Sequence, residues 1–223
     1  NGLATGLIFD QSILDNAILS IKTEYYNRGL YSVIITPVVT QLERNRVNIE
    51  IQISEGSIAK IAAIDFIGNK IYSTNQLRKE MYLTTGNWMS WWYKDNQYSS
   101  DKLAGDFEKI RAFYLNNGYI DFRLNSAQIQ LSPDKQSVFI TGNIIEGEQY
   151  RFKSIQLAGD YKDIPPAVLT PLITVKPGQI INQETLNKNI ETIKNTMGNY
   201  GYAFANVNPV PDVNVKDHTV AYN

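Results

Sequence analysis

The sequence predicts an α+β fold in which one unit, strand–helix–helix–strand–strand, is repeated along the chain. Each unit is expected to hold a three-stranded mixed sheet with two helices packed on one face. Three observations predict this: a helix ending that occurs three times, paired segments of alternating apolar and polar residues, and a Glu-Gly pair that occurs twice. A length of 223 residues suits one large domain or two to three small ones.

The first observation is a helix that occurs in three copies, which Gly29, Gly118 and Gly201 align. Apolar residues precede each glycine at the spacing i, i+4, i+7, i+11, which places them on one helix face. The three sets are Leu14, Ile18, Ile21 and Tyr25; Leu103, Phe107, Ile110 and Tyr114; and Leu186, Ile190, Ile193 and Met197. Three amphipathic helices of the same length are therefore expected.

Each of these helices has a start signal and a stop signal. Asp10, Ser99 and Asn182 stand four residues before the first leucine of each set, and such side chains cap helix starts. At the other end, a glycine enters the left-handed conformation of a helix C-cap without a steric penalty. We therefore expect Gly29, Gly118 and Gly201 to be structural caps. One glycine cap is common, but three in register indicate a repeated unit.

An extended segment, a polar turn and a second extended segment follow each glycine. The turns are expected at Arg44-Asn45, Pro133–Lys135 and Lys216-Asp217. Over residues 47–53, four apolar residues alternate with three polar ones, which predicts a sheet with one buried and one solvated face. Glu-Gly pairs at 55–56 and 146–147 then lead into the next unit with almost no linker.

These patterns divide the chain into three expected domains. Residues 1–58 form a partial unit without its first strand and helix, residues 59–147 a complete unit, and residues 148–223 a unit whose last strand is clipped. In the complete unit, the first helix is expected to begin at the capping-box sequence Ser73–Gln76. In the third unit it is expected to begin at Asp163–Pro166, because proline is tolerated in a first helical turn.

Composition and charge disfavour several functions. Lysine and arginine number 21 against 22 aspartate and glutamate, and no basic run is concentrated anywhere. Nucleic-acid binding, which needs a positive stripe, is therefore not expected. There are no cysteines, which excludes disulfides and thiolate zinc sites. No stretch approaches the about 20 apolar residues of a membrane-spanning helix.

The sequence offers little for catalysis, so we expect neither an enzyme nor a cofactor or metal. His218 is the only histidine. No second histidine is available to activate a serine or threonine, so the usual serine–histidine triad is not expected. Asp101, Asp106 and Glu108 are expected on the solvated face of their helix. A hydrolase with an unrecognised site remains the alternative from another functional class.

The densest unusual feature is an aromatic loop formed by Trp88, Trp91, Trp92 and Tyr93, between the two helices of the complete unit. Large aromatic side chains usually serve burial, so the first interpretation is that they pack the loop onto its own domain. The second is a partly exposed contact patch, because Trp and Tyr are enriched at interfaces.

A sheet edge is the other candidate site. A three-stranded sheet cannot close and therefore exposes strands that can pair with an extended partner. The strand after the glycine contains Pro37 in the first copy, and Pro209 and Pro211 in the third, but no proline in the second. The candidate partner-binding residues there are Phe122, Arg123, Leu124, Asn125, Ser126, Ala127, Gln128 and Ile129. Leu124→Pro is expected to weaken binding, unless the strand is merely solvated or covered by a neighbour.

The ordered motifs resemble the POTRA (polypeptide-transport-associated) domains of the Omp85 family of outer-membrane proteins. They are GNK at 68–70, WMSWWY at 88–93, DKLAGDFEKIRAFYLNNGYIDF at 101–122, LSPDK at 131–135 and EGEQY at 146–150, with LERNRVN at 42–48 and GNYGYA at 198–203. The resemblance covers part of a second, all of a third and most of a fourth POTRA domain.

This resemblance implies a non-catalytic scaffold in the periplasm of a Gram-negative bacterium, as part of the β-barrel assembly machinery. The implied partners are unfolded outer-membrane proteins, bound by strand addition at sheet edges, and lipoprotein subunits of the assembly complex. Further POTRA domains and a membrane β-barrel of the same parent chain are implied as well. The alternative is the POTRA region of another Omp85 protein, such as a two-partner secretion transporter.

Overall fold

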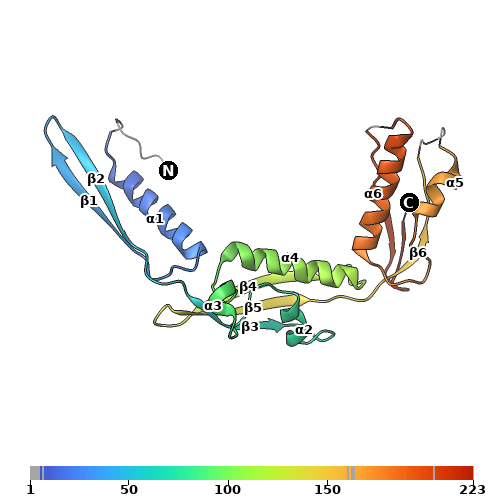
Figure 1. Cartoon of the computed structure of the whole chain (residues 1–223), viewed down its shortest axis with the longest axis horizontal. Helices are drawn as coiled ribbons and strands as arrows, with labels where there is room; N and C mark the ends of the chain where they lie inside the picture. Colours follow the sequence, from blue (N-terminus) through green and yellow to red (C-terminus); the bar gives the residue numbers. More distant parts are fainter. Residues whose placement is uncertain (1–5, 7, 160, 162–163, 203, 223) are drawn as a thin grey trace. The chain divides into compact units, whose positions relative to one another are not determined.

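The computed structural model describes residue 6, residues 8–159, residue 161 and residues 164–202 and 204–222. Asp163, expected near the start of a helix, lies outside this part of the chain. The helices are α1 Gln11–Asn27, α2 Thr74–Lys79, α3 Ser90–Tyr93, α4 Ser100–Asn116, α5 Pro166–Leu169, the 3₁₀ helix η1 Thr170–Leu172 and α6 Gln183–Asn199 (Figure 1). The strands are β1 Ile34–Leu42, β2 Arg46–Ser54, β3 Lys60–Ile67, β4 Arg123–Leu131, β5 Ser137–Ile145, β6 Arg151–Ile155, β7 Pro211–Asn214 and β8 Thr219–Tyr222.

The strands form one antiparallel pair, β1-β2, and two three-stranded sheets with the orders β3-β5-β4 and β6-β8-β7. In both larger sheets the first strand pairs in parallel with the last one, which takes the central place. The parallel register shifts between Ile61 and Ala63 in β3 and between Phe152 and Ser154 in β6. The helices and the three-stranded mixed sheets confirm the predicted α+β fold class, and the shared register shift is a further likeness between the two sheets.

The three repeated helices, α1, α4 and α6, each contain 17 residues. The Asp10 side chain accepts hydrogen bonds from the N–H groups of Ser12 and Ile13. Asn182 accepts one from the N–H of Thr185 at 2.8 Å. These bonds satisfy N–H groups that have no partner within the first helical turn. None of the helices among the described residues is long and apolar enough to cross a membrane.

The helix ends share one geometry. The backbone φ angle is 81° at Gly29, 87° at Gly118 and 94° at Gly201, in the left-handed region. The residue after each glycine donates its N–H to the carbonyl five residues earlier, over 2.9 Å from Leu30, 3.0 Å from Tyr119 and 3.1 Å from Tyr202. This bond, with the left-handed glycine, is the Schellman arrangement that closes a helix end.

Burial of the helix stripe differs between the copies. In α4 all four stripe residues are buried, whereas in α1 only Leu14 of the four is buried. The Phe107 ring of α4 meets the Phe66 ring of β3 edge-on, with centroids 6.5 Å apart. Gly142 of β5 leaves room for both rings, because a Cβ atom there would lie 3.0 Å from Phe66 and 3.3 Å from Phe107.

Asp106 does not lie on the solvated face of α4, where the sequence pattern placed it. Only 1% of it is exposed, and its carboxylate accepts the N–H groups of Tyr82 and Leu83, both at 2.7 Å. The carboxylate thus satisfies the backbone of the chain that follows α2, a structural role that helical periodicity alone does not reveal. Asp101 and Glu108 are exposed, as expected.

The Glu-Gly pair at 146–147 ties the end of the complete unit to α4. Glu146 is 6% exposed, and its carboxylate accepts the Tyr114 hydroxyl at 2.7 Å and the N–H groups of Lys70 and Ile71 at 2.7 and 3.0 Å. Burial, and then the bond to Glu146, raise the pKa of the Tyr114 hydroxyl, which therefore stays protonated and donates.

The same contact is present in the first unit. There the Tyr25 hydroxyl donates to Glu55 at 3.0 Å. Glu55 is exposed, because the described part of the first unit has no counterpart of the Lys70–Ile71 turn. A tyrosine near the helix end and the glutamate directly after β2 or β5 are therefore a repeated pair.

By its internal contacts the chain forms two compact units, one with residues 1–67, 74–108 and 126–143 and the other with residues 68–73, 109–125 and 144–223. These units cut across the expected domain limits near residues 58 and 147. The physical reason is that backbone hydrogen bonds span both limits, from the N–H of Ala59 to Gly29 and from the N–H of Tyr150 to Gly118. The division into three domains stays a prediction.

Candidate partner-binding site

Strand β4 lies at one edge of its sheet, with β5 as its neighbour. All nine of its residues are exposed, and none is a proline. Among the larger apolar side chains, 36% of Leu124 and 43% of Ile129 is exposed. Seven of the eight residues predicted for partner binding lie in this strand: Arg123, Leu124, Asn125, Ser126, Ala127, Gln128 and Ile129.

Phe122, the eighth, is not available to a partner. It precedes the strand, and only 4% of it is exposed. Its ring stacks on that of Tyr114, with centroids 4.2 Å apart and 12° between the planes. Its N–H donates to the carbonyl of Tyr119 at 3.1 Å. Phe122 therefore fixes the start of β4 against the end of α4.

Two hydrogen bonds fix the register between β4 and β5. The N–H of Ser132 donates to the carbonyl of Ser137 at 2.9 Å across the turn. Along the strands, the Asn143 side chain donates to the Ser126 hydroxyl at 2.8 Å. Ser126 lies six residues before Ser132, and Asn143 lies six residues after Ser137. One antiparallel register therefore holds along this length of the hairpin.

This register decides which backbone groups of β4 face the open edge. In an antiparallel pair, alternate residues exchange both backbone hydrogen bonds with the neighbouring strand, and the residues between them point outward. Since Ser132 bonds with Ser137, the inward residues of β4 are Leu124, Ser126, Gln128 and Gln130. The outward ones, which can pair with a further strand, are Asn125, Ala127 and Ile129.

The register also changes the choice of test substitution. A proline at Leu124 would remove a hydrogen bond to β5, so Leu124→Pro would weaken the sheet itself as well as any partner binding. Ala127 directs its N–H to the open edge and lies opposite Gly142. A proline at Ala127 removes an outward donor and leaves the β4–β5 ladder in place.

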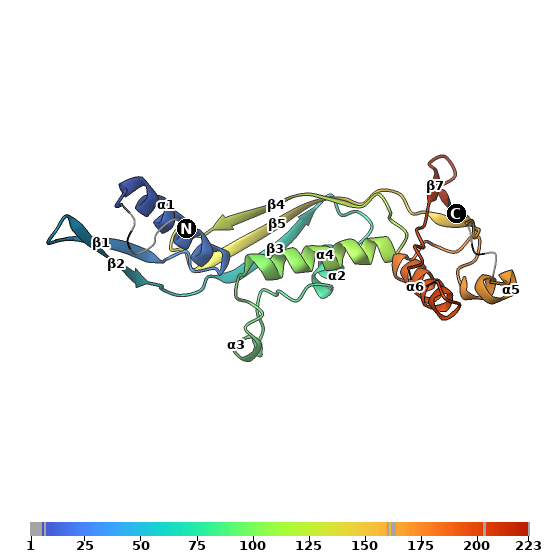
Figure 2. The same ribbon diagram turned by 90° about the horizontal axis from the view of Figure 1, so that it is seen from above.

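The aromatic loop does not pack onto its own domain. The exposed fraction is 83% for Trp88, 74% for Trp91, 71% for Trp92 and 57% for Tyr93. Figure 2 shows α3, which contains three of these residues, standing away from β3, β4 and β5. The expectation that these aromatic side chains are buried was therefore wrong. Within α3 the buried residue is Ser90, of which only 3% is exposed.

Hydrogen bonds within the loop define the path of its backbone. The Ser90 hydroxyl accepts the N–H of Asn87, and the Ser90 carbonyl accepts the N–H of Lys94, both at 2.8 Å. The Asn87 side chain accepts the N–H of Met89 at 2.8 Å. Trp91 and Trp92 meet edge-on, with ring centroids 5.4 Å apart. The loop therefore presents an exposed aromatic surface.

Substituting the exposed tryptophans should leave the fold intact. We expect the Trp91→Ser/Trp92→Ser double variant to change the free energy of unfolding by about 0.5 kcal/mol or less, since surface substitutions away from structural features have small effects. Urea unfolding followed by circular dichroism measures this. Leu83→Ser, at a site with 1% exposure in the same region, is the control and should be strongly destabilising. A large loss of stability in the double variant would contradict the exposed arrangement.

A cavity of about 400 Å³ lies beside α6 and is mostly apolar. Its lining includes Leu186, Ile190 and Ile193 of α6, with Ile155 and Tyr222 from the sheet. Asn189 also lines the cavity, and its side chain accepts the N–H of Thr174 at 3.1 Å. In the same way, the Asp106 side chain of α4 accepts backbone N–H groups of the chain after α2.

The only histidine, His218, does not line this cavity. It lies at a turn with a φ of 49°, next to the Tyr150 ring. No cluster of metal-binding side chains occurs among the described residues.

Known proteins are similar to this chain in sequence and in fold. A family model for POTRA, described as "Surface antigen variable number repeat", matches residues 2–56, 59–147 and 150–223. The chain is 39% identical over 221 residues to the outer membrane protein assembly factor BamA of Neisseria meningitidis serogroup B, covering 99% of this chain and 28% of the relative. It is 27% identical to BamA of Buchnera aphidicola, covering 99% of this chain and 36% of the relative.

Solved structures are similar as well, among them the crystal structure of Haemophilus influenzae BamA POTRA3-5. It aligns with a TM-score of 0.64 and 28% identity, over 74% of this chain and 65% of that one. The present chain spans about a third or less of the two curated relatives. Because the family model matches three successive segments that together cover almost all of it, the chain belongs to the POTRA family.

Proposed function

We propose that this chain is the POTRA region of an outer-membrane protein assembly factor and acts in the periplasm of a Gram-negative bacterium. It serves as a scaffold that binds unfolded outer-membrane proteins and docks other subunits, and it performs no catalysis. The similarity to BamA over 99% of the chain supports the assembly role. The open edge of β4 is the single structural observation that supports substrate binding.

Strand addition is the proposed mode of substrate binding. The N–H and C=O groups of Asn125, Ala127 and Ile129 pair with an extended segment, which becomes the fourth strand of the sheet. Main-chain hydrogen bonds supply the affinity, so many different segments can bind. Unfolded outer-membrane barrels consist of strand segments that alternate apolar and polar residues, which suits such an edge. Binding is weak, because a free segment loses conformational entropy when it is ordered.

The aromatic loop is the proposed docking point for a folded subunit, such as a lipoprotein of the assembly complex. Trp88, Trp91 and Trp92 offer large rigid surfaces, and tryptophan is enriched among the residues that carry most of the binding energy at interfaces. The position of α3 away from β3, β4 and β5 (Figure 2) would leave the edge of β4 free for substrate. Both tasks would then fall to the unit that the sequence predicts over residues 59–147.

The test compares Ala127→Pro with Ala127→Val. A synthetic peptide with the alternating sequence of an outer-membrane barrel strand is added to the ¹⁵N-labelled chain, and amide shifts are recorded. In the parent chain and in Ala127→Val, shifts should cluster at residues 123–131. In Ala127→Pro these shifts should fall at least several-fold at the same peptide concentration, because one outward donor is lost.

Two results would count against strand addition. One is an equal response of Ala127→Pro and Ala127→Val to the peptide. The other is a response confined to residues 88–93, which would assign the peptide to the aromatic loop. Circular dichroism of both variants serves as the folding control.

A further inference from the structure

Strand β3 is the second edge of the sheet that contains β4. The first part of this edge is covered by a segment of its own unit. The carbonyl of Ala59, directly before β3, accepts the N–H of Tyr98 at 3.0 Å, and the N–H of Ile61 donates to the carbonyl of Asn96 at 2.8 Å. The chain before α4 therefore already occupies the backbone groups through which another strand could pair with this part of β3.

The third sheet has the same cover on its first strand. The N–H of Phe152 in β6 donates to the carbonyl of Gln179 at 2.9 Å, and the carbonyl of Tyr150 accepts the N–H of Ile181 at 3.0 Å. Phe152 follows Ile61 by 91 residues, the spacing between the two Glu-Gly pairs. A covered first part of this edge is thus a feature of the repeated unit.

The second part of the β3 edge is closed by Arg78 of α2. The Nε of Arg78 donates to the carbonyl of Ile64 at 2.6 Å, and one terminal nitrogen donates to the Asp65 carboxylate at 2.8 Å. The other terminal nitrogen donates to the side-chain oxygen of Asn75 at 3.5 Å. All three nitrogens of the planar guanidinium group therefore have an acceptor, which defines its orientation at the edge.

The bond from Arg78 shows which backbone groups of β3 face away from β5. Neighbouring residues of a strand direct their backbone groups to opposite sides, so Ile64 faces the open side, and so does Phe66 two residues later. A strand that added to this part of the edge would pair with these two residues. It would have to displace the guanidinium from the Ile64 carbonyl and disrupt the ion pair with Asp65.

This closure is particular to the unit that contains β4. In the third unit Leu169 is buried, as Leu77 of α2 is, but the next residue is Thr170 where α2 has Arg78. The other edge strand of the third sheet, β7, begins with Pro211, whereas β4 contains no proline. The arginine therefore occurs in the sheet whose opposite edge is open to an extended partner.

The ion pair between Arg78 and Asp65 contributes little to stability. The side chains are 35% and 59% exposed, and ion pairs in contact with water add little to the free energy of unfolding. The arginine can therefore be replaced without loss of the fold, and the effect of its bonds is on what the β3 edge can bind.

We propose that Arg78 determines which edge of this sheet accepts an extended segment. It closes β3, so that the segment adds at β4 alone and the unit binds one strand at a time. Without the arginine, the second part of β3 would accept another segment or pair with another sheet, as exposed edges do. This inference rests on the proposed strand addition and names the residue that directs it.

The test compares Arg78→Met with Lys79→Met. Methionine keeps most of the apolar stem of arginine and removes the guanidinium, while Lys79→Met removes the same charge from an exposed neighbouring position. A peptide with the alternating sequence of an outer-membrane barrel strand is added to each ¹⁵N-labelled chain. In Arg78→Met the amides of Ile64 and Phe66 should shift at least several-fold more than in Lys79→Met or the parent chain, at the same peptide concentration.

A double variant isolates the β3 edge. Arg78→Met/Ala127→Pro should respond to the peptide at residues 63–67 and lose most of the response at residues 123–131, because one outward donor of β4 is removed. Circular dichroism of each variant is the folding control. Arg78→Ala should give the same response as Arg78→Met and replaces it as the test if the methionine variant does not fold.

Two results would overturn the inference. One is an equal response of Ile64 and Phe66 in Arg78→Met and in the parent chain. The other is a response of these amides in the parent chain as large as that of β4, because the edge would then be open despite the arginine. The outcome for β4 is separate. If Arg78→Met responds at residues 63–67 while no chain responds at residues 123–131, the closure by Arg78 stands and the proposed substrate edge fails.

Discussion

Replacement of Gly118 by valine is expected to destabilise the chain by about 3 kcal/mol or more. Two costs contribute. A left-handed backbone costs about 1–2 kcal/mol for a residue with a Cβ atom, and overpacking adds about 1–3 kcal/mol. The second cost applies because a Cβ at this site would lie 2.7 Å from Ile180 and 2.9 Å from the Tyr150 carbonyl oxygen. Urea unfolding monitored by circular dichroism gives the difference.

Gly201→Val is the matched control for this prediction. Its φ of 94° is close to the 87° of Gly118, but the space around it is open. Only the conformational cost should remain, about 1–2 kcal/mol. If both valines destabilised the chain equally, the close packing around Gly118 would not contribute to the loss of stability.

Removal of the buried carboxylate at Glu146 should have an effect of similar size. Glu146→Ala leaves the buried hydroxyl of Tyr114 and the part-buried N–H groups of Lys70 and Ile71 without their acceptor. Each unsatisfied buried donor costs about 1–3 kcal/mol, so a total loss of about 3 kcal/mol or more is expected. Glu146→Gln keeps one acceptor oxygen and should fall between the variant with alanine and the parent chain.

Glu55→Ala tests whether burial is the cause. Glu55 occupies the equivalent place in the first unit and accepts the Tyr25 hydroxyl, but it is exposed. Water can replace the lost acceptor, so we expect a loss of about 1 kcal/mol or less. Thermal and urea unfolding of the two alanine variants provide the comparison. A loss at Glu55 as large as that at Glu146 would rule out burial as the source of the effect.

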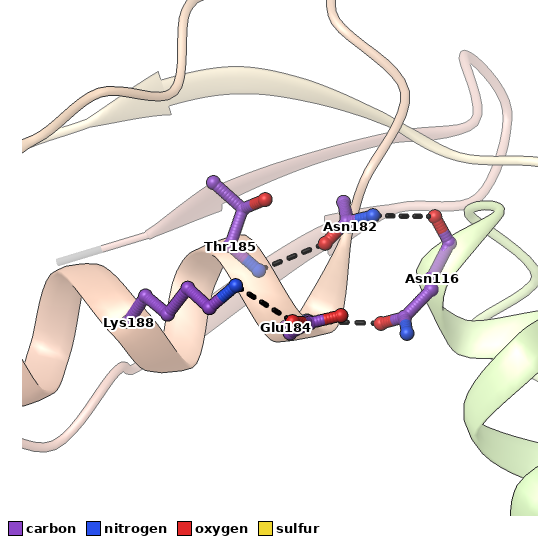
Figure 3. A network of polar contacts seen from close by, with 5 residues as sticks. All are labelled: Asn116, Asn182, Glu184, Thr185 and Lys188. Carbon is purple, nitrogen blue, oxygen red and sulfur yellow. Dashed lines mark hydrogen bonds and ion pairs between the residues drawn. The ribbon is translucent and has the colours of Figure 1, made fainter.

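Much of the fold follows from local features of the sequence. The spacing of apolar residues located α1, α4 and α6, because a helix repeats its faces every 3.6 residues wherever it lies. The capping side chains at Asp10 and Asn182 act within one turn of their own helix, as Figure 3 shows for Asn182. The left-handed glycines follow from a steric property of a single residue. Each of these predictions needed only neighbours in sequence.

The candidate sites depended on contacts between distant segments. The sequence identified β4 as an edge strand without proline, but not which of its N–H groups face outward. That depends on the register with β5, which the bond between Asn143 and Ser126 reveals. Similarly, the clustering of Trp88, Trp91 and Trp92 was visible, but their exposure was not. Exposure is decided by whether another segment covers them.

Asp106 and Phe122 show why the remaining predictions failed. The local pattern placed Asp106 in contact with solvent and Phe122 in contact with a binding partner, yet both are buried. Asp106 meets the backbone after α2, and Phe122 stacks on Tyr114. Such a residue is buried when the fold brings another segment against it that supplies donors or a ring, and the period of a helix or strand does not record this.

By itself, the sequence determined the repeated unit, its three helices with their caps, and the expected edge strand. Only the tertiary structure decided the register of that edge, the exposure of the aromatic loop, the burial of Asp106 and Glu146, and the close packing at Gly118. The reason is physical: backbone conformation and periodicity are set by neighbours in the chain, whereas burial and hydrogen-bond partners are set by which segments meet in space.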